Sequence, residues 1–145
     1  MLEARRLVDV ELAEQRSQRL ADRRAAVYID LTRFLLAQDA KLYDNHPLDP
    51  RVRTQPLEIP HFDDANLDVQ LRAFASEDVL RLVEEWRKYV SIVVKLIGDS
   101  QQQTDDRARS KLEEERDWNS TWAHDQMVKV QEQIRLEGSP NQPGQ

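Results

Sequence analysis

The chain has 145 residues, a formal net charge of −6, no cysteine and three glycines. The lack of cysteine excludes disulfides, thiolate metal sites and thiol nucleophiles, and three scattered glycines exclude phosphate loops, which need closely spaced glycines. No long basic block is present, so we expect no binding to nucleic acid, and no run approaches the 18 apolar residues of a membrane-spanning helix.

The first predicted element is a helix from about Leu2 to Tyr43, which contains neither glycine nor proline and is rich in good helix formers. From Leu20 onward, apolar residues recur on one side of this helix at 100° per residue, with Tyr28 at the edge of the stripe. The stripe consists of Leu20, Val27, Leu31, Phe34, Leu35 and Leu42. The part before Leu20 is more polar, and we expect it to project, to fray or to form a coiled coil.

A second apolar row lies nearly opposite this stripe, formed by Ile29, Leu36 and Tyr43 at a spacing of seven residues. A helix that is apolar on two sides is usually covered by more than one neighbour. The second row therefore faces either another helix of the same chain or another molecule.

The segment of about 45–64 contains Pro47, Pro50, Pro56 and Pro60, and repeated proline disfavours a helix. We interpret it as an ordered crossover, with disorder as the second choice. The sequence His61–Asp64 could be a cluster of ligands, but Asp63 or Asp64 is more simply explained as the cap of the next helix.

A short helix containing Leu67, Leu71 and Phe74 follows, and Ser76 resembles the N-cap of a third helix. Gly98 is predicted to follow the end of that helix as its C′ residue. The apolar residues of the third helix occupy a band of about 120° at 100° per residue. They are Val79, Leu82, Val83, Trp86, Val90, Val93, Val94 and Ile97.

The last predicted helix begins around Ser100–Thr104 and ends near Glu137, before Gly138 and Pro140. Trp118 and Trp122 lie at the margin of its apolar face, where core packing is the favoured interpretation and a partner-facing role is the alternative. The apolar face consists of Ala108, Leu112, Ala123, Met127, Val130 and Ile134.

One polar face of the last helix carries Glu113, Asp117, Ser120 and His124 within about 60°. Two carboxylates and an imidazole could bind a divalent cation or transfer a proton. The simpler interpretation is a solvated acidic face, because helical metal sites usually take ligands from several helices. We expect no cofactor, no metal and no catalytic residues.

The predicted fold is all-α: an irregular three- or four-helix bundle with two long helices and a Pro-rich crossover. We expect residues 1–137 to form a single helical domain and residues 138–145 to form a disordered tail.

Two segments resemble recurring segments of a family of uncharacterised actinobacterial helical proteins. Asp22–Leu31 (DRRAAVYIDL) is similar to an "RRxAVYxDLLRF"-like segment, and Leu71–Leu80 (LRAFASEDVL), with Trp86 beyond it, to an "LxAFxSxxVxxxxxxW"-like segment. In that family the first segment often follows membrane-spanning helices, whereas a charged helix stands there in this chain. The resemblance implies helix packing and no assigned activity.

These observations favour a non-catalytic, helical interaction or scaffold protein that binds a protein partner or forms a homo-oligomer. The candidate partner-binding residues are Ile29, Leu36, Tyr43, Trp118 and Trp122. A membrane-associated regulatory module, with peripheral contact only, is the first alternative. A metal-dependent enzyme using Glu113, Asp117 and His124 is the second. Because the first residues lack the apolar run of a signal peptide, we expect a cytoplasmic location, including the inner face of the membrane.

Overall fold

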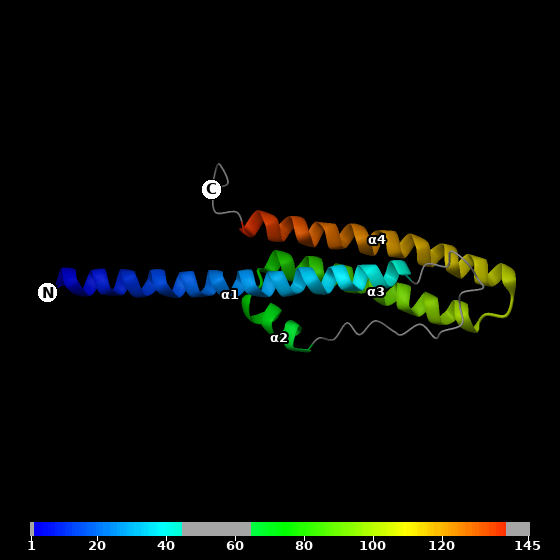
Figure 1. Cartoon of the computed structure of the whole chain (residues 1–145), viewed down its shortest axis with the longest axis horizontal. Coiled ribbons are helices and arrows are strands. Elements are labelled where there is room, and N and C mark those ends of the chain that lie inside the picture. Colours follow the sequence, from blue (N-terminus) through cyan, green and yellow to red (C-terminus); the bar gives the residue numbers. More distant parts are fainter. Residues whose placement is uncertain (1, 45–64, 139–145) are drawn as a thin grey trace.

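The computed structural model describes residues 2–44 and 65–138, with residues 43, 44 and 65 described as backbone only. This part of the chain is all-α (Figure 1), as predicted. Its helices are α1 (Leu2–Asp44), α2 (Ala65–Phe74), α3 (Glu77–Gln102) and α4 (Asp106–Gly138). The expected crossover at 45–64, the sequence His61–Asp64 and residues 139–145 lie outside the described residues.

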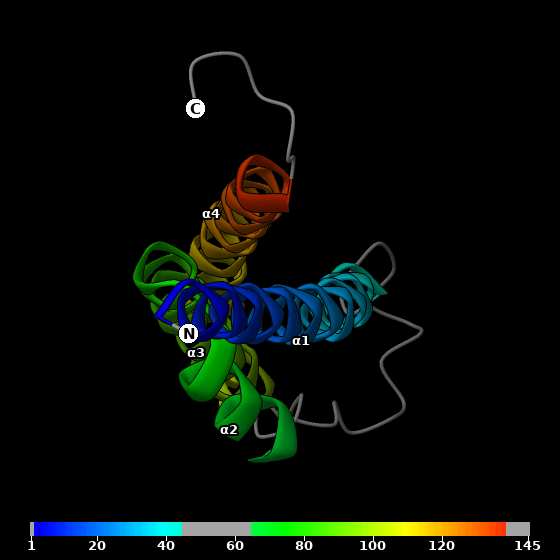
Figure 2. The same cartoon turned by 90° about the vertical axis from the view of Figure 1, so that its left-hand side faces the viewer.

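The two last helices form an antiparallel pair, joined by a short connection at residues 103–105. α1 packs along this pair, running in the same direction as α3 and antiparallel to α4 (Figure 1). Figure 2 shows α4 above α1 and the short α2 below it. The bundle is therefore built on the α3–α4 pair, and α1 and α2 complete it.

The core lies where α1, α3 and α4 meet. Phe34 of α1 packs edge-on against Trp86 of α3, with ring centroids 6.0 Å apart. Trp86 is among the largest fully buried side chains, and burial of an aromatic ring of this size contributes strongly to stability. Its fully buried neighbours in the core are Leu31, Leu35, Leu71, Val79, Val90, Val93, Ala123 and Val130.

Ser76 is confirmed as the N-cap of α3. Its backbone is extended, with φ −68° and ψ 159°, and its side-chain oxygen accepts a hydrogen bond from the backbone N–H of Val79 at 3.1 Å. This bond satisfies one of the donors that the first turn of a helix leaves without a partner. Ser76 therefore lies at the turn where the chain changes direction between α2 and α3.

The predicted boundary between the last two helices is wrong. Gly98 is not a C′ residue, because α3 continues through it to Gln102. The added turn includes the buried Ser100, whose hydroxyl donates to the carbonyl oxygen of Ile97 at 3.0 Å. α4 begins at Asp106 rather than within Ser100–Thr104, since the Asp105 carboxylate accepts from the backbone N–H of Ala108 and caps the helix.

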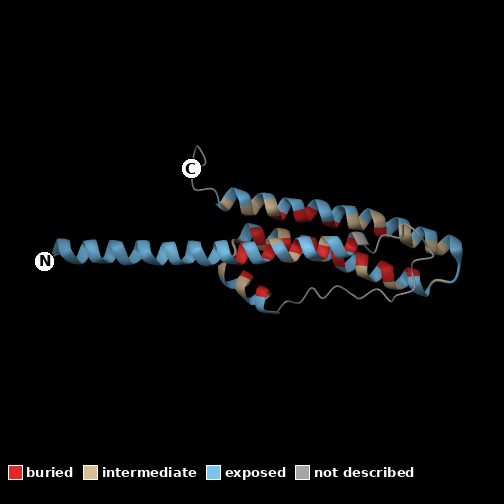
Figure 3. Cartoon of the chain, viewed as in Figure 1, coloured by how far each residue is buried: buried red, intermediate tan, exposed pale blue. Residues whose placement is uncertain are grey.

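The N-terminal part of α1 projects beyond the bundle (Figure 3), and every residue from 2 to 26 is exposed. We call residues 2–26 the overhang. Leu20, which we predicted to belong to the buried stripe, is 58% exposed because it lies in the overhang. Burial begins only at Val27 and Tyr28, where the other described helices reach α1.

Candidate interaction surfaces

The second apolar row of α1 faces away from the bundle. Ile29 and Leu36 are 54% and 50% exposed, so no other described helix covers them. The side chain of Tyr43, the third predicted member, lies outside the described part of the structure. The two described members are thus accessible, as a partner-binding surface requires.

Trp118 and Trp122 are exposed rather than packed in the core, so our favoured interpretation of them was wrong. Their ring centroids are 6.2 Å apart, and Trp122 lies 6.1 Å from the ring of Tyr89 in α3. Helix geometry explains the exposure, because the core face of α4 is centred on Ala123 and Met127, and at 100° per residue Trp122 lies about 120° and Trp118 about 160° from that centre. The three rings form a ridge along the outer side of the α3–α4 pair.

The structure does not bring the predicted row on α1, Ile29 and Leu36, together with the predicted tryptophans of α4, Trp118 and Trp122. His124 points from α4 toward α1, where its Nδ1 lies 2.9 Å from Oδ2 of Asp39. Trp122 precedes His124 by two residues, a rotation of about 200° on a helix, and it points toward α3 instead. The ridge and the row of Ile29 and Leu36 are therefore separate surfaces.

The predicted polar face of α4 forms no metal centre among the described residues, in which no group of three potential metal ligands is present. His124 pairs with Asp39 of α1, and Asp117 accepts a hydrogen bond from Arg116 at 3.2 Å. These carboxylates and the imidazole therefore make local polar contacts at the edge of the bundle.

The two segments that carry the family resemblance lie directly against each other. Arg24 donates from Nε to the carbonyl oxygen of Phe74 at 2.7 Å, at the C-terminal end of α2. The guanidinium carbon of Arg23 lies 5.5 Å from the centroid of the Phe74 ring, within the range of a cation–π contact. Both arginines of the DRR sequence thus fix the end of α2 against α1, which makes their role structural.

A hydrogen-bond network next to this contact joins α1, the start of α3 and the end of α4. The Tyr28 hydroxyl and the Ser76 hydroxyl donate to the two carboxylate oxygens of Glu137, each at 2.8 Å. The backbone N–H of Ser76 donates to the Tyr28 oxygen at 3.0 Å, and Gln133 donates to Glu137 at 2.9 Å. Burial raises the pKa of Tyr28 above its ordinary value. The hydrogen bonds with Ser76 lower this pKa, whereas the hydrogen bond and the charge of Glu137 raise it further.

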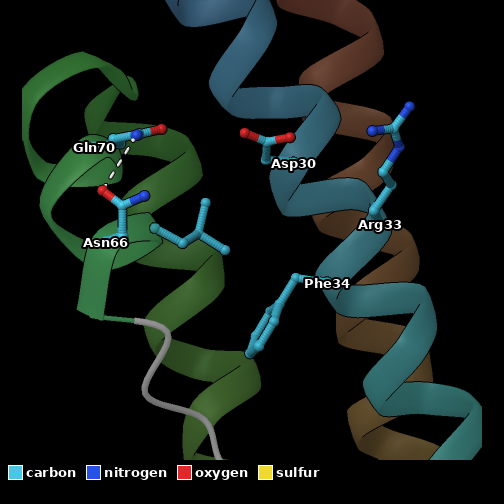
Figure 4. Close-up of a pocket in the computed structure, with 6 residues that line it drawn as sticks. Asp30, Arg33, Phe34, Asn66 and Gln70 are labelled. Atoms are coloured by element: carbon cyan, nitrogen blue, oxygen red, sulfur yellow. Dashed lines mark hydrogen bonds between the residues drawn. The ribbon is translucent and has the colours of Figure 1, made fainter.

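A pocket lies between α1 and α2 (Figure 4). Asn66 and Gln70 of α2 form its polar side, joined by a 3.4 Å hydrogen bond, and Asp30 and Phe34 of α1 face them. Arg33 also lines it, although the guanidinium extends away from α2 in this view. The lining offers a single carboxylate and amides, without a base next to a nucleophile, so it shows no catalytic arrangement.

The overhang is the surface that our list of candidate residues missed. It exposes six large apolar side chains, which are Leu2, Leu7, Val8, Val10, Leu12 and Leu20. A helix that projects into water with few tertiary contacts is marginally stable by itself, since helices in proteins gain most of their stability from packing. The continuation of the main stripe toward the N-terminus was the available signal in the sequence.

No protein-family model, curated protein or solved structure matches the chain. No described helix has a stretch long and apolar enough to cross a membrane. The fold itself defines an all-α protein whose first helix extends far beyond its own bundle.

Proposed function

We propose that this chain is a non-catalytic interaction or scaffold protein that associates through its helices. The overhang carries the proposal: its six large apolar side chains, between residues 2 and 20, are exposed before α1 reaches α2 at Arg23 and Arg24. Exposed apolar surface of this kind marks sites of protein association. The ridge of Trp118, Trp122 and Tyr89 is a second accessible surface, of the aromatic type enriched in binding hot spots.

The proposal places this role in the cytoplasm, in agreement with a chain that contains no cysteine. Its test is the state of association of the full chain. Light scattering coupled to size exclusion would measure the mass at several concentrations, and a pull-down would recover helical partners. We expect an assembly or a defined partner, and loss of either when the apolar side chains of the overhang are replaced. A monomer that recovers no partner contradicts the proposal.

Peripheral association with a membrane is a second candidate, because the exposed overhang also carries four arginines outside the contact with α2. They are Arg5, Arg6, Arg16 and Arg19. Basic helices with apolar side chains can lie on anionic lipid surfaces. This candidate predicts sedimentation of the chain with anionic vesicles and its loss at high salt. Absence of sedimentation at low salt would eliminate it.

A further inference from the structure

The exposed face of the overhang continues the face of α1 that is buried in the bundle. Between residues 7 and 21, six residues with apolar or small side chains lie within about 140° of the helix circumference at 100° per residue, a sector in which Glu3, Arg6, Glu14 and Arg24 also lie. This set, the overhang stripe, consists of Leu7, Val10, Ala13, Ser17, Leu20 and Ala21. The sector overlaps the one that carries Tyr28, Leu31 and Leu35, which are buried. Among the described helices, the same face is therefore covered from residue 27 onward and not before it.

The end of α4 determines where the buried part of α1 stops and the exposed overhang begins. Glu137, the last residue but one of α4, contacts Tyr28, and α4 runs antiparallel to α1 (Figure 1). A helix that covers the overhang stripe must occupy the extension of the path of α4. A second α1 placed parallel and in register on that stripe would continue into the volume of α4 itself. If the covering helix is the α1 of a second copy, it must therefore run antiparallel to the first.

A second copy of this chain supplies such a helix. When two overhangs run antiparallel, the tip of each points toward Glu137 of the other, and the two bundles lie at opposite ends. The stripe is self-complementary about a centre between Ala13 and Glu14. Leu7 then lies at the level of Leu20, and Val10 at the level of Ser17. Small side chains near the centre allow the two helices to approach closely.

The charges at the flanks of the stripe agree with this arrangement in part. Asp9 and Arg16 lie on the same flank, and antiparallel pairing places Asp9 of one copy within about one turn of Arg16 of the other, twice by symmetry. Glu3 similarly comes to the level of Arg24. Glu14, next to the twofold axis, comes close to its own counterpart, and this repulsion weakens the pair.

We propose that residues 2–26 pair antiparallel with the same segment of a second copy through the overhang stripe, which gives a twofold-symmetric dimer. This inference rests on the proposed function and names its partner. Contact through a single face distinguishes this dimer from non-specific hydrophobic association, because Val8 and Leu12 lie on the opposite side of the same helix and stay exposed in the dimer.

Val8 and Val10 provide a matched pair for the test, because both are 53% exposed and they lie on opposite faces of one helix. Light scattering over a series of concentrations measures the dissociation constant of the dimer. We expect Val10→Asp to raise this constant by about 100-fold or more, since symmetry places two unpaired carboxylates in the contact. Val8→Asp should leave the constant within about twofold of the wild-type value, and Glu14→Gln should lower it by about two- to threefold. Fluorescence of the buried Trp86 confirms that each variant is folded.

The direction of the helices can be read by cross-linking, because the chain contains no native cysteine. Under mild oxidation, Ala13→Cys should link to its own counterpart, which lies near the twofold axis. Val10→Cys should not link alone, but it should link when mixed with Ser17→Cys, because both lie near the middle of the stripe and at the same level. Efficient linking of Val10→Cys by itself would indicate parallel helices and overturn the proposal.

The outcomes separate this inference from the proposed function. If both valine variants stay dimeric while a Trp118→Ala and Trp122→Ala double variant becomes monomeric, the chain self-associates through the ridge. The pairing of overhangs is then wrong and the proposed function stands. A wild-type chain that is monomeric at every concentration overturns the pairing, and the proposed function then depends on a different helical partner.

Discussion

The hydroxyl of Tyr28 in α1 donates to Oε1 of Glu137 in α4 at 2.8 Å, across 109 positions of sequence. Ser76, the N-cap of α3, donates to the other oxygen of the same carboxylate. One carboxylate thus connects three helices at the level where the overhang begins.

Replacing Glu137 with Gln should destabilise the bundle by about 1–2 kcal/mol, because hydrogen bonds to a charged group are stronger than those to a neutral one. Glu132→Gln is the matched control on the same helix. Glu132 is exposed and forms an ion pair with the exposed Arg135, so this change should cost less than about 0.5 kcal/mol. Urea unfolding followed by circular dichroism measures both, and equal effects would show that the network adds nothing.

The stability of the protein should fall at alkaline pH in part through Tyr28. The pKa of Tyr28 is raised above its ordinary value of 10.0, first by burial. A group with a raised pKa in the folded state contributes stability that is present below pH 10 and is lost as the pH rises through the folded-state pKa. Tyr28→Phe should therefore show a smaller loss of unfolding free energy above pH 10 than the wild type. Parallel curves for the two proteins would contradict this assignment.

Asp68 should contribute to the attachment of α2 to α3 in an acid-sensitive way. Arg87 donates to Asp68 at 2.8 Å and holds the pKa of that carboxyl below its usual value of 3.8. Its contribution is present above pH 3.8 and is lost as the pH falls through the lower, folded-state pKa. Asp68→Asn should cost about 1 kcal/mol at neutral pH and less in acid, whereas Asp78→Asn, at an exposed pair with Arg81, should cost almost nothing.

Trp86 and Trp118 should respond differently to the same substitution. Trp86 is 1% exposed and Trp118 is 57% exposed. Trp86→Phe removes packed volume from the core and should cost about 1–2 kcal/mol, whereas Trp118→Phe should change stability by less than about 0.5 kcal/mol. Chemical denaturation of both variants checks this. A large cost at Trp118 would mean that the ridge stabilises the monomer rather than serving a partner.

Gly98→Ala should stabilise the protein by about 0.5–1 kcal/mol, because Gly98 lies inside α3 and glycine is unfavourable within a helix. A Cβ atom there meets nothing within 4 Å, so the alanine fits without strain. Gly138→Ala has equal space but lies at the end of α4, where the helix frays and the gain should be smaller. We expect a higher urea concentration at the midpoint of unfolding for Gly98→Ala than for the wild type. A lower midpoint would indicate that α3 ends at Gly98.

Most of the fold follows from local patterns that the sequence displays. The periodicity of Val79 to Ile97 predicts α3 and its buried face, and Ser76 predicts where that helix begins. The boundary at Gly98 could not be predicted, because glycine is compatible with both a helix interior and a helix end. What decides between them is the burial of Ser100, a tertiary property.

The candidate surfaces were predictable only in part. The row of Ile29 and Leu36 was visible as a second stripe, and both residues are exposed. Leu20 and the two tryptophans were placed incorrectly because periodicity shows which residues share a face and not how far a neighbouring helix extends. The end of α4 opposite Tyr28 decides the exposure of Leu20, and that contact joins residues far apart in sequence.

α1 runs without interruption for 43 residues from the free tip into the core. With 25 of them in the overhang and a rise of 1.5 Å per residue, Leu2 stands about 37 Å along the helix from Val27, the first buried residue. The overhang can therefore act as a spacer as well as a contact: whatever it joins is held at a distance set by the number of residues before Val27. Adding or removing whole turns of helix there would change that distance in steps of about 5.4 Å.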